Sequence, residues 1–380
     1  MRIAFFSEAF EPQVNGVAVT ISKVTEYLRN CGHEILLMVP ETPRASNDSS
    51  LVEMKCVPLP LYPEMPIILP HWSFHKKPLA RLEAFQPDLI HIWTPGVMAF
   101  FALKWARHHG CPVASSYETD LISYLDYYGF GRFKPQLWRY LRWLHNNSHR
   151  TYVPSMETKL FLEAGGIRNV EVFGRGVDVD RFCPSKRSAE RREQFGLRPD
   201  GVLILYVGRL SREKNLPLLL KEAEKLTANN RQVHLAVTGT GPLWKELTRS
   251  FGNRRITFTD VQRGEDLATL FASADVFALP SSTETLSLVS MEAMASGVPV
   301  LAMNAGGVRD FLKHRVNSLL ANDAAEFAGF LRLLTWDAEL RKRLGANGRR
   351  CTEAQSWTDV LKQLEHDYVG LASHKGKLCA

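Results

Sequence analysis

The sequence predicts an α/β protein with two doubly wound parallel sheets that face each other across a cleft. Short apolar runs alternate with helical patterns along a chain of 380 residues, which is too long for one ordinary core. Strands and helices that alternate in this way form right-handed βαβ units and parallel sheets. The alternation stops between residues 172 and 200, a stretch rich in Gly, Pro and charge, and then restarts. We therefore expect two domains of the Rossmann-like kind.

The expected elements follow in chain order. In the first half we expect strands at residues 3–6, 34–39, 89–93 and 113–116, with helices at 17–31 and 97–109. In the second half we expect strands at 202–207, 234–238, 256–258 and 276–279, with helices at 216–228, from about 242, at 266–273 and at 286–295. The predicted domains are residues 1–178 and 179–356, and the tail from about 357 to 380 is expected to pack back on the first.

The bulk composition limits the choice of partners and compartment. The formal charge of +7 favours anionic partners such as nucleotides, acidic lipids or nucleic acid. Six cysteines without a C-x-x-C pair indicate reduced thiols in a cytoplasm. The first ten residues resemble a strand rather than a signal peptide, and the longest apolar stretch, 96–103, is far shorter than the roughly 20 residues of a membrane span. We expect a cytoplasmic protein.

Two glycine turns suggest phosphate binding without proving it. Gly16 precedes the first helix, where a glycine lets backbone N–H groups approach a phosphate closely, although for this glycine taken alone an ordinary turn glycine is the better explanation. The stretch from Gly239 to Trp244 begins like the dinucleotide fingerprint G-x-G-x-x-G but lacks its third glycine. This disfavours a hydride-transfer enzyme.

A basic pair follows the strand expected at residues 202–207. Arg209 and Lys214 leave the carboxyl end of this strand together, where ligands of parallel sheets bind. An arginine offers a fork for phosphate oxygens and a lysine a point charge. The alternative is a solvated basic loop beside Glu213, and the residues alone leave both open.

Two acids flank the start of the helix expected at residues 286–295. Glu284 lies in the loop before it and can reach the hydroxyls of a sugar, while the free N–H groups of Thr285 and Leu286 can hold a diphosphate. Glu292 lies eight residues later, about 12 Å along a helix, which is too far for a hydrolytic carboxylate pair. This separation suits a nucleoside diphosphate sugar, with a hexose at Glu284 and a ribose at Glu292. A plain helix-surface acid remains the alternative for Glu292.

These motifs together resemble the retaining glycosyltransferases of family four, which have two facing Rossmann-like domains (the GT-B fold). The resemblance covers almost the whole chain, and its specificity comes from the order and spacing of the motifs. They are Asn15-Gly16-Val17, Gly174-Arg175-Gly176-Val177-Asp178, Val207-Gly208-Arg209-Leu210 with Lys214-Asn215, Gly239-Thr240-Gly241-Pro242, Glu284-Thr285, and Glu292 to Pro299.

The resemblance implies an activity and a set of ligands. It implies metal-independent, cofactor-free transfer of a hexose from a UDP- or GDP-linked donor, with retention through front-face attack. It places the donor in the C-terminal domain, with the first acid on the donor sugar, the second on the ribose, the Arg-Lys pair on the diphosphate, and the base near Gly239 and Val261. The acceptor belongs to the N-terminal domain, and a lipid or lipid-linked sugar is favoured. The rivals are a sugar-nucleotide epimerase and a non-catalytic sugar-nucleotide-binding protein.

Two positions depart from the family pattern. Members often carry a histidine before the threonine in the cleft near the donor sugar, and this chain has Glu118 there, which makes Glu118 a second catalytic candidate. Position 287 is Ser where many relatives have Gly.

Two further patterns resemble metal sites. Asp178-Val179-Asp180 is a D-x-D triplet, but it falls at the domain junction within the Gly-Val-Asp motif. His145 and His149 have the spacing of zinc ligands but lack the adjacent Glu, and we interpret them as helix-surface histidines. We therefore expect no metal site.

The segment from Gly131 to Arg150 is basic and amphipathic. It combines basic residues with Phe133, Trp138 and Trp143 and contains no acid. Such a helix suits an anionic membrane surface, for instance the inner face of a cell membrane. The alternative is a core-facing helix whose basic residues face solvent.

Overall fold

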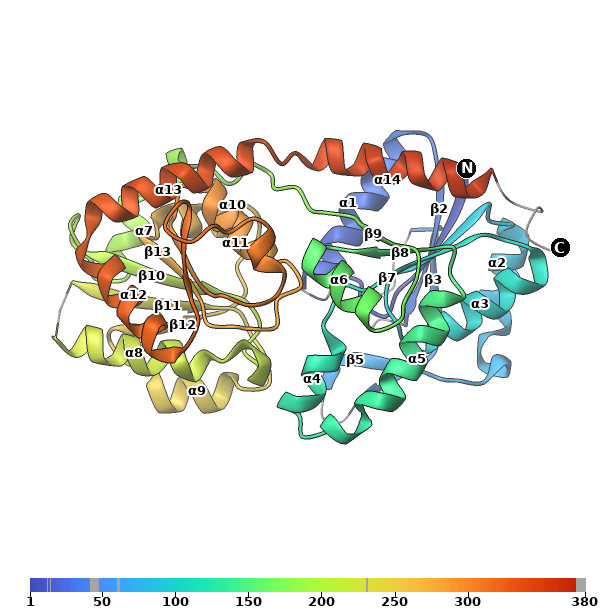
Figure 1. Ribbon diagram of the computed structural model, residues 1–380, viewed down its shortest axis with the longest axis horizontal. Helices are drawn as coiled ribbons and strands as arrows, with labels where there is room; N and C mark the ends of the chain where they lie inside the picture. The colour runs from blue at the N-terminus through green and yellow to red at the C-terminus, as the bar shows by residue number, and fades with distance from the viewer. Residues whose placement is uncertain (12, 14, 42–47, 60–61, 230–231, 374–380) are drawn as a thin grey trace. The chain divides into compact units, whose positions relative to one another are not determined.

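The computed structural model describes residues 1–11, 13, 15–41, 48–59, 62–229 and 232–373. The chain forms two compact units (Figure 1). Unit one comprises Met1–Ile122, Gly131–Gly174 and Asp359–Ala380, and unit two comprises Ser123–Phe130 and Arg175–Thr358. The main division after Gly174 lies slightly before the predicted boundary at residue 178, and the transfer of Ser123–Phe130 to unit two was not anticipated.

Unit one contains a seven-stranded parallel sheet in the order β3-β2-β1-β6-β7-β8-β9. Its strands are β1 (Arg2–Phe6), β2 (Glu34–Pro40), β3 (Leu51–Met54), β6 (Leu89–Ile92), β7 (Val113–Ser116), β8 (Arg150–Val153) and β9 (Val170–Val172). An antiparallel hairpin, β4 (Cys56–Leu59) with β5 (Tyr62–Ile68), lies outside this sheet. The central strands are apolar because both of their faces are covered, as parallel sheets require.

The helices of unit one connect these strands. They are α1 (Gly16–Asn30), α2 (Lys76–Phe85), α3 (Val97–His109), α5 (Lys134–Asn146) and α6 (Met156–Ala164), with short 3₁₀ turns η1 (Trp72–His75) and η2 (Gly131–Phe133). The Asn15 side chain accepts a hydrogen bond from the Ala18 N–H at 2.8 Å, which satisfies one of the free donors at the start of α1.

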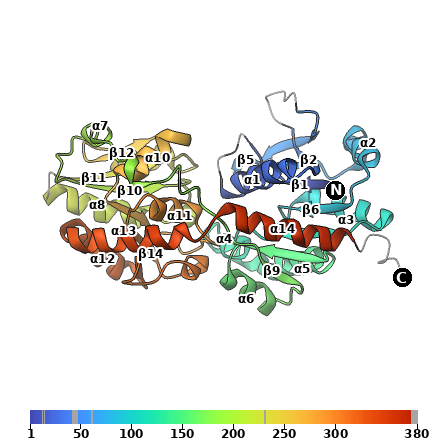
Figure 2. The ribbon, with the colours of Figure 1, turned by 90° about the horizontal axis from the view of Figure 1, so that it is seen from above.

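The C-terminal helix α14 (Trp357–Ala372) lies beside α1 in both ribbon views (Figures 1 and 2). Glu365 accepts a hydrogen bond from the Tyr27 hydroxyl at 2.9 Å and pairs with His33 Nε2 at 2.9 Å. Tyr368 is fully buried and its hydroxyl hydrogen-bonds to His91 on β6. These contacts attach the helix to unit one.

Unit two contains a six-stranded sheet in the order β12-β11-β10-β13-β14-β15, parallel throughout. Its strands are β10 (Val202–Val207), β11 (Val233–Thr238), β12 (Ile256–Thr259), β13 (Val276–Leu279), β14 (Val300–Met303) and β15 (Ser318–Ala321). The order turns back between β10 and β13, which is the doubly wound arrangement.

Helices cover both faces of this second sheet. Figure 1 shows α8 and α9 on one side and α10 and α11 on the other. The helices are α7 (Ala189–Glu193), α8 (Leu216–Asn229), α9 (Trp244–Phe251), α10 (Gly264–Ser273), α11 (Leu288–Ala295), α12 (Ala324–Trp336) and α13 (Ala338–Glu353), with 3₁₀ turns η3 (Pro184–Lys186), η4 (Arg212–Lys214) and η5 (Gly306–Asp310). Among the helices of the described residues, none is both long and apolar enough to cross a membrane.

Candidate active site

The predicted donor residues of unit two follow four neighbouring strands. Arg209 and Lys214 follow β10, Gly239 follows β11, Val261 follows β12, and Glu284 follows β13. These strands are adjacent in the sheet, and parallel strands present their carboxyl ends at one edge. The fold of unit two therefore brings all five residues to the same edge of its sheet.

Lys214 and Glu284 form an ion pair at this edge. The Lys214 Nζ lies 2.7 Å from Glu284 Oε1, and the two side chains are only 18% and 10% exposed. Burial of the ammonium disfavours its charged form, but Glu284, Tyr206 and Glu213 together outweigh this and raise the pKa of Lys214 above its ordinary value. The interpretation of Lys214 as part of a solvated basic loop is therefore wrong.

Glu213, which sequence reasoning treated as a solvent neighbour of Lys214, is fully buried. Its carboxylate accepts hydrogen bonds from the Ser211 hydroxyl at 2.5 Å and from the Tyr128 hydroxyl at 2.9 Å. Only the position of an acid between two basic residues is visible in the sequence, and nothing there indicates its burial.

The glycines of the Gly239-Thr240-Gly241 turn allow two backbones to touch. Gly239 has φ of +132°, and a Cβ at this position would collide with the Gly208 carbonyl oxygen. A Cβ on Gly241 would collide with the backbone of Leu210. The loops after β10 and β11 are therefore packed backbone against backbone. This contact restricts the backbone path of the loop that carries Arg209. The Tyr206 hydroxyl adds a hydrogen bond to the Arg209 carbonyl at 2.9 Å.

A second glycine pair, which sequence reasoning missed, holds the Glu284 backbone. Gly306 and Gly307 follow β14, and the Gly307 N–H donates to the Glu284 carbonyl at 2.7 Å. Gly306 has φ of +66°, and a Cβ there would collide with the same carbonyl oxygen. In the sequence, the Gly306-Gly307 doublet after an apolar run is the signal from which this close backbone contact could be predicted.

The helix after Glu284 begins two residues later than predicted. Sequence reasoning placed its first turn at Thr285 and Leu286, but α11 begins at Leu288 with Ser287 as its N-cap. Ser287 has φ of +90° and ψ of +82°, which no α-helical residue can have, and Leu286 is buried in the core of unit two. The free N–H groups of this helix terminus therefore start at Leu288, and Thr285 and Leu286 belong to the loop that precedes it.

Glu292 lies in the second turn of α11 and is half-buried. Burial raises the pKa of Glu292 to about 8, although Arg181 opposes this shift. An acid of this kind is protonated at neutral pH and can donate as well as accept hydrogen bonds. The alternative of a plain surface acid does not fit this environment.

The remaining predicted residues lie in unit one. Gly16 is the first residue of α1, after the carboxyl end of β1, and the half-buried Glu118 follows β7. Glu8, which sequence reasoning did not consider, is buried close to the same end of β1. It accepts a hydrogen bond from the Met98 N–H at 2.8 Å and another from the Thr94 hydroxyl. Burial raises the pKa of Glu8.

The metal-like patterns have structural explanations. Asp178 accepts a hydrogen bond from the Arg181 N–H at 3.0 Å and so closes a turn. His145 is fully buried, shares a hydrogen bond with Ser115 at 2.9 Å, and has its pKa lowered to about 3 by burial, so its interpretation as a surface histidine is wrong. His149 accepts a hydrogen bond from the Val113 N–H at 3.0 Å. No group of three or more His, Cys, Asp or Glu able to hold a metal occurs within the described part of the chain.

The two Rossmann-like units, each built on a parallel sheet, have the GT-B fold of glycosyltransferases. Comparison with known proteins agrees. Residues 14–181 match the model of Glycosyltransferase Family 4, and residues 187–351 match that of Glycosyl transferases group 1. The chain belongs to glycosyltransferase family 4 and is a hexosyltransferase that uses a nucleotide sugar.

Individual relatives support this assignment. The chain is 34% identical to a GDP-mannose-dependent alpha-mannosyltransferase of Mycolicibacterium smegmatis, over 99% of both chains. It is 31% identical to the sulfoquinovosyl transferase SQD2 of Arabidopsis thaliana, over 98% of this chain and 74% of that one. Among solved structures, sucrose-phosphate synthase from Thermosynechococcus elongatus matches with a TM-score of 0.81 at 20% identity, over 98% and 99% of the two chains, which shows a shared fold.

Proposed function

We propose that this protein transfers a mannosyl residue from GDP-mannose, with retention of configuration, to a hydroxyl of a membrane lipid or glycolipid. The donor part of this proposal rests on one observation, the partly buried Lys214–Glu284 pair at the sheet edge of unit two, in which the ammonium lies 2.7 Å from the carboxylate. The choice of GDP-mannose over a UDP-linked hexose rests on the similarity to GDP-mannose-dependent enzymes.

The proposed roles follow from the chemistry of each group. Arg209 and Lys214 bind the diphosphate, Glu284 accepts hydrogen bonds from hexose hydroxyls, and Glu292 binds the ribose. The backbone around Gly239 and Val261 receives the base, and the loop of Thr285 and Leu286 with the N-terminus of α11 adds N–H donors for phosphate oxygens. Gly16, at the start of α1, is proposed as a further donor-binding residue from its place in the Asn15-Gly16-Val17 motif.

In the proposed reaction, the bond between the hexose C1 and the β-phosphate oxygen breaks while C1 bonds to the acceptor oxygen on the same face. The departing diphosphate gains negative charge, and the Arg209 and Lys214 cations stabilise this charge in the transition state. The acceptor proton passes to a diphosphate oxygen. Glu118 is a second catalytic candidate, assigned by its place in the family pattern. Because the chain supplies these cations itself, we propose that no divalent metal or cofactor takes part.

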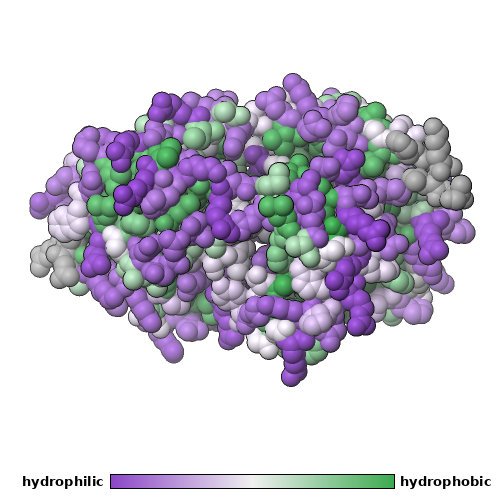
Figure 3. Space-filling model, viewed as in Figure 1, coloured by the Kyte–Doolittle hydropathy of each residue, from purple (hydrophilic) through white to green (hydrophobic). Residues whose placement is uncertain are grey.

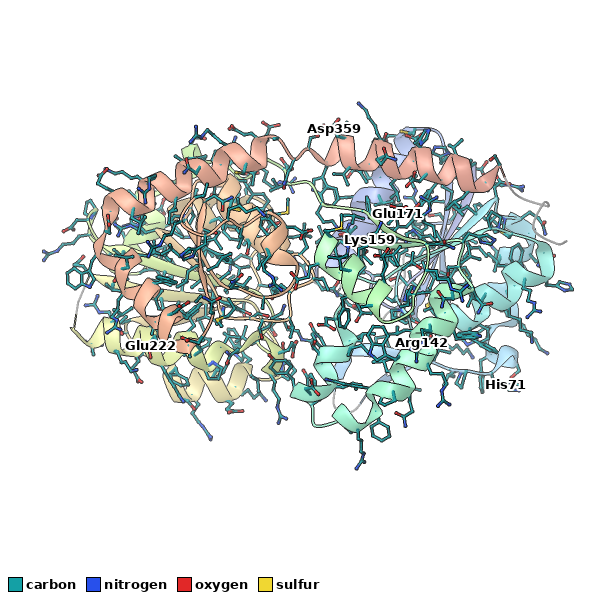
Figure 4. All side chains as sticks on the ribbon, viewed as in Figure 1. His71, Arg142, Lys159, Glu171, Glu222 and Asp359 are labelled. Atoms are coloured by element: carbon teal, nitrogen blue, oxygen red, sulfur yellow. The ribbon has the colours of Figure 1, made fainter. Side chains whose placement is uncertain are left out.

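The membrane half of the proposal rests on the outer face of α5. Leu141 and Leu144 are buried while Arg139, Arg142 and Trp143 are exposed, so the helix has a core side and a basic, aromatic side. Arg142 is labelled in Figure 4, and Figure 3 shows hydrophilic residues interleaved with pale ones where Figure 1 places α5. Such a surface suits anionic headgroups and the interfacial region.

A neighbouring groove extends this surface. It has a volume of about 690 Å³ and lies between α3 and α5. Phe100 and Trp143 line it with rings 6.3 Å apart, and Lys104 and Arg107 line it from α3. Exposed aromatic rings beside basic side chains support docking on an anionic bilayer.

The test is acceptor-dependent release of nucleoside diphosphate. The protein is first screened for thermal stabilisation by GDP-mannose, UDP-glucose and UDP-galactose, and the stabilising donor is incubated with and without vesicles containing diacylglycerol or phosphatidylinositol. We expect diphosphate release that requires the acceptor lipid and persists in EDTA. Release with a free sugar product and no acceptor would instead indicate an epimerase, and donor binding without any release would indicate a non-catalytic binding protein.

A further inference from the structure

A short segment from the first half of the sequence belongs to the donor-binding unit. Ser123–Phe130 forms part of unit two, whereas the residues immediately before and after it belong to unit one. We call this segment the tyrosine arm. It includes the end of α4 (Leu121–Tyr127) and a turn in which Gly129 has φ of +77° and the Phe130 N–H donates to the Leu125 carbonyl at 2.7 Å. The helix end and this turn hold Tyr127 and Tyr128 in place.

Both tyrosines hydrogen-bond to the loops that carry the predicted donor ligands. The Tyr128 hydroxyl donates to Glu213 Oε2 at 2.9 Å, and Glu213 immediately precedes Lys214. The Tyr127 hydroxyl lies 3.0 Å from Ser282 Oγ, two residues before Glu284. Each tyrosine therefore supports one half of the Lys214–Glu284 pair.

Glu213 transmits the support of Tyr128 to Lys214. A fully buried carboxylate is costly unless hydrogen bonds replace its lost water, and the donors to Glu213 are Ser211 and Tyr128. Glu213 and Lys214 lie in the same single turn, η4, so fixing the first fixes the direction of the second. The Ser281 hydroxyl donates to the Glu213 carbonyl at 3.3 Å and links this turn to the loop of Glu284.

We infer that Tyr128 and Tyr127 are positioning residues for the sugar-nucleotide site: Tyr128 orients Lys214 through Glu213, and Tyr127 orients the Glu284 loop through Ser282. The inference rests on the proposed function, because it takes Lys214 as the diphosphate ligand and Glu284 as the sugar ligand. It has an asymmetric consequence. Loss of the Tyr128 hydroxyl weakens diphosphate binding, whereas loss of the Tyr127 hydroxyl acts on transfer of the sugar.

The test compares Tyr128→Phe and Tyr127→Phe by calorimetric titration with GDP and GMP, and with UDP and UMP. For Tyr128→Phe we expect the affinity for the preferred diphosphate to fall by about three- to tenfold, less than for direct loss of a charged hydrogen bond. Affinity for the monophosphate should be unchanged because it lacks the β-phosphate. For Tyr127→Phe we expect a lower kcat at an unchanged diphosphate affinity.

Tyr27→Phe is the matched control. It removes a tyrosine hydrogen bond of the same length, 2.9 Å, to a carboxylate of unit one, Glu365. It should change the melting temperature and leave diphosphate affinity and kcat as in the wild type. Glu213→Gln supplies a second check, because residues that act in series are not additive. The double variant of Tyr128→Phe with Glu213→Gln should lose no more diphosphate affinity than the worse single variant.

Three results would overturn the inference. They are wild-type diphosphate affinity in a folded Tyr128→Phe protein, an equal loss of monophosphate affinity, and an additive double variant. None of these results would by itself reject the proposed function, which is tested separately by Lys214→Ala. If Lys214→Ala left diphosphate affinity intact, the donor site itself would be wrongly assigned, whereas a weakened Lys214→Ala beside a normal Tyr128→Phe rejects only the tyrosine arm.

Discussion

The Lys214 ammonium and the Glu284 carboxylate, seventy residues apart in the sequence, lie 2.7 Å from each other at the carboxyl edge of the unit two sheet. Each stabilises the charge of the other in a partly buried position. A sugar nucleotide bound here would offer Lys214 a phosphate oxygen and Glu284 a sugar hydroxyl, so the ligand competes with the ion pair for the same two groups. The expected effects of substituting Lys214 and of substituting Glu284 therefore differ.

Lys214→Ala removes the diphosphate cation. We expect the affinity for nucleoside diphosphate and for the donor to fall alike, by about 1.5–3 kcal/mol, the range for a lost charged hydrogen bond. Calorimetric titration measures both. Nucleoside monophosphate is the control ligand, and an equal loss of its affinity would contradict the assignment of Lys214 to the diphosphate.

Glu284→Gln keeps the shape of the sugar ligand and removes its charge. We expect turnover to fall while the affinity for nucleoside diphosphate stays equal or rises, because Lys214 no longer has a competing carboxylate. Initial rates at saturating donor and titration with nucleoside diphosphate measure the two effects. Wild-type turnover in this variant would remove Glu284 from the sugar site.

Glu292 should make the stability of the protein depend on pH. The folded protein holds this proton to about pH 8, whereas the unfolded chain releases it near 4.5, so the folded state binds more protons between these values. The free energy of unfolding therefore falls as pH rises through this window, by up to about 1.4 kcal/mol per pH unit from this group alone. Urea unfolding of the wild type and of Glu292→Gln at pH 5.5 to 8.5 isolates the contribution. A wild type whose stability relative to the variant does not fall across this range would contradict the raised pKa of Glu292.

Ser287→Gly should stabilise unit two. Ser287 has φ of +90°, and a non-glycine residue in such a conformation costs about 1–3 kcal/mol. Glycine adds about 0.5–1 kcal/mol of chain entropy to the cost of folding and loses the cap to the Ser290 N–H, a few tenths. We expect a net gain near 1 kcal/mol, seen as a melting temperature about 2–4 °C higher. Ser290→Ala, which removes only the hydroxyl contact to Ser287, is the control, and a lower melting temperature for Ser287→Gly would disprove the strain.

The sequence predicted the central strands of the sheets and the loops of the site. It predicted the edge strands and the burial of polar side chains less well. Long apolar strands such as β10 and glycine turns such as Gly239 carry local signals, because burial on both faces and close backbone approach each restrict residue type. Short edge strands such as β9, with a glutamate between two valines, give no such signal. The burial of Glu213 and His145 depends on partners far along the chain, Tyr128 and Ser115, which no local pattern reveals.

The membrane prediction concerns the outer face of α5. Arg139 and Arg142 are exposed there, and each basic residue near an anionic surface contributes about 1 kcal/mol to binding. We expect the protein to pellet with vesicles containing anionic lipid, to pellet much less with neutral vesicles, and to be released by raised salt, since exposed charges are screened over about 8 Å at physiological ionic strength.

The double variant Arg139→Glu with Arg142→Glu should abolish this binding while donor affinity persists, because both residues belong to unit one and the predicted donor ligands Lys214 and Glu284 to unit two. Arg249→Glu with Arg254→Glu is the matched control. It makes the same change in net charge at exposed positions of unit two, and it should still pellet. A folded α5 variant that pellets fully, or a wild type indifferent to anionic lipid, would reject the membrane surface. The acceptor would then be sought among water-soluble sugars, with the donor site unchanged.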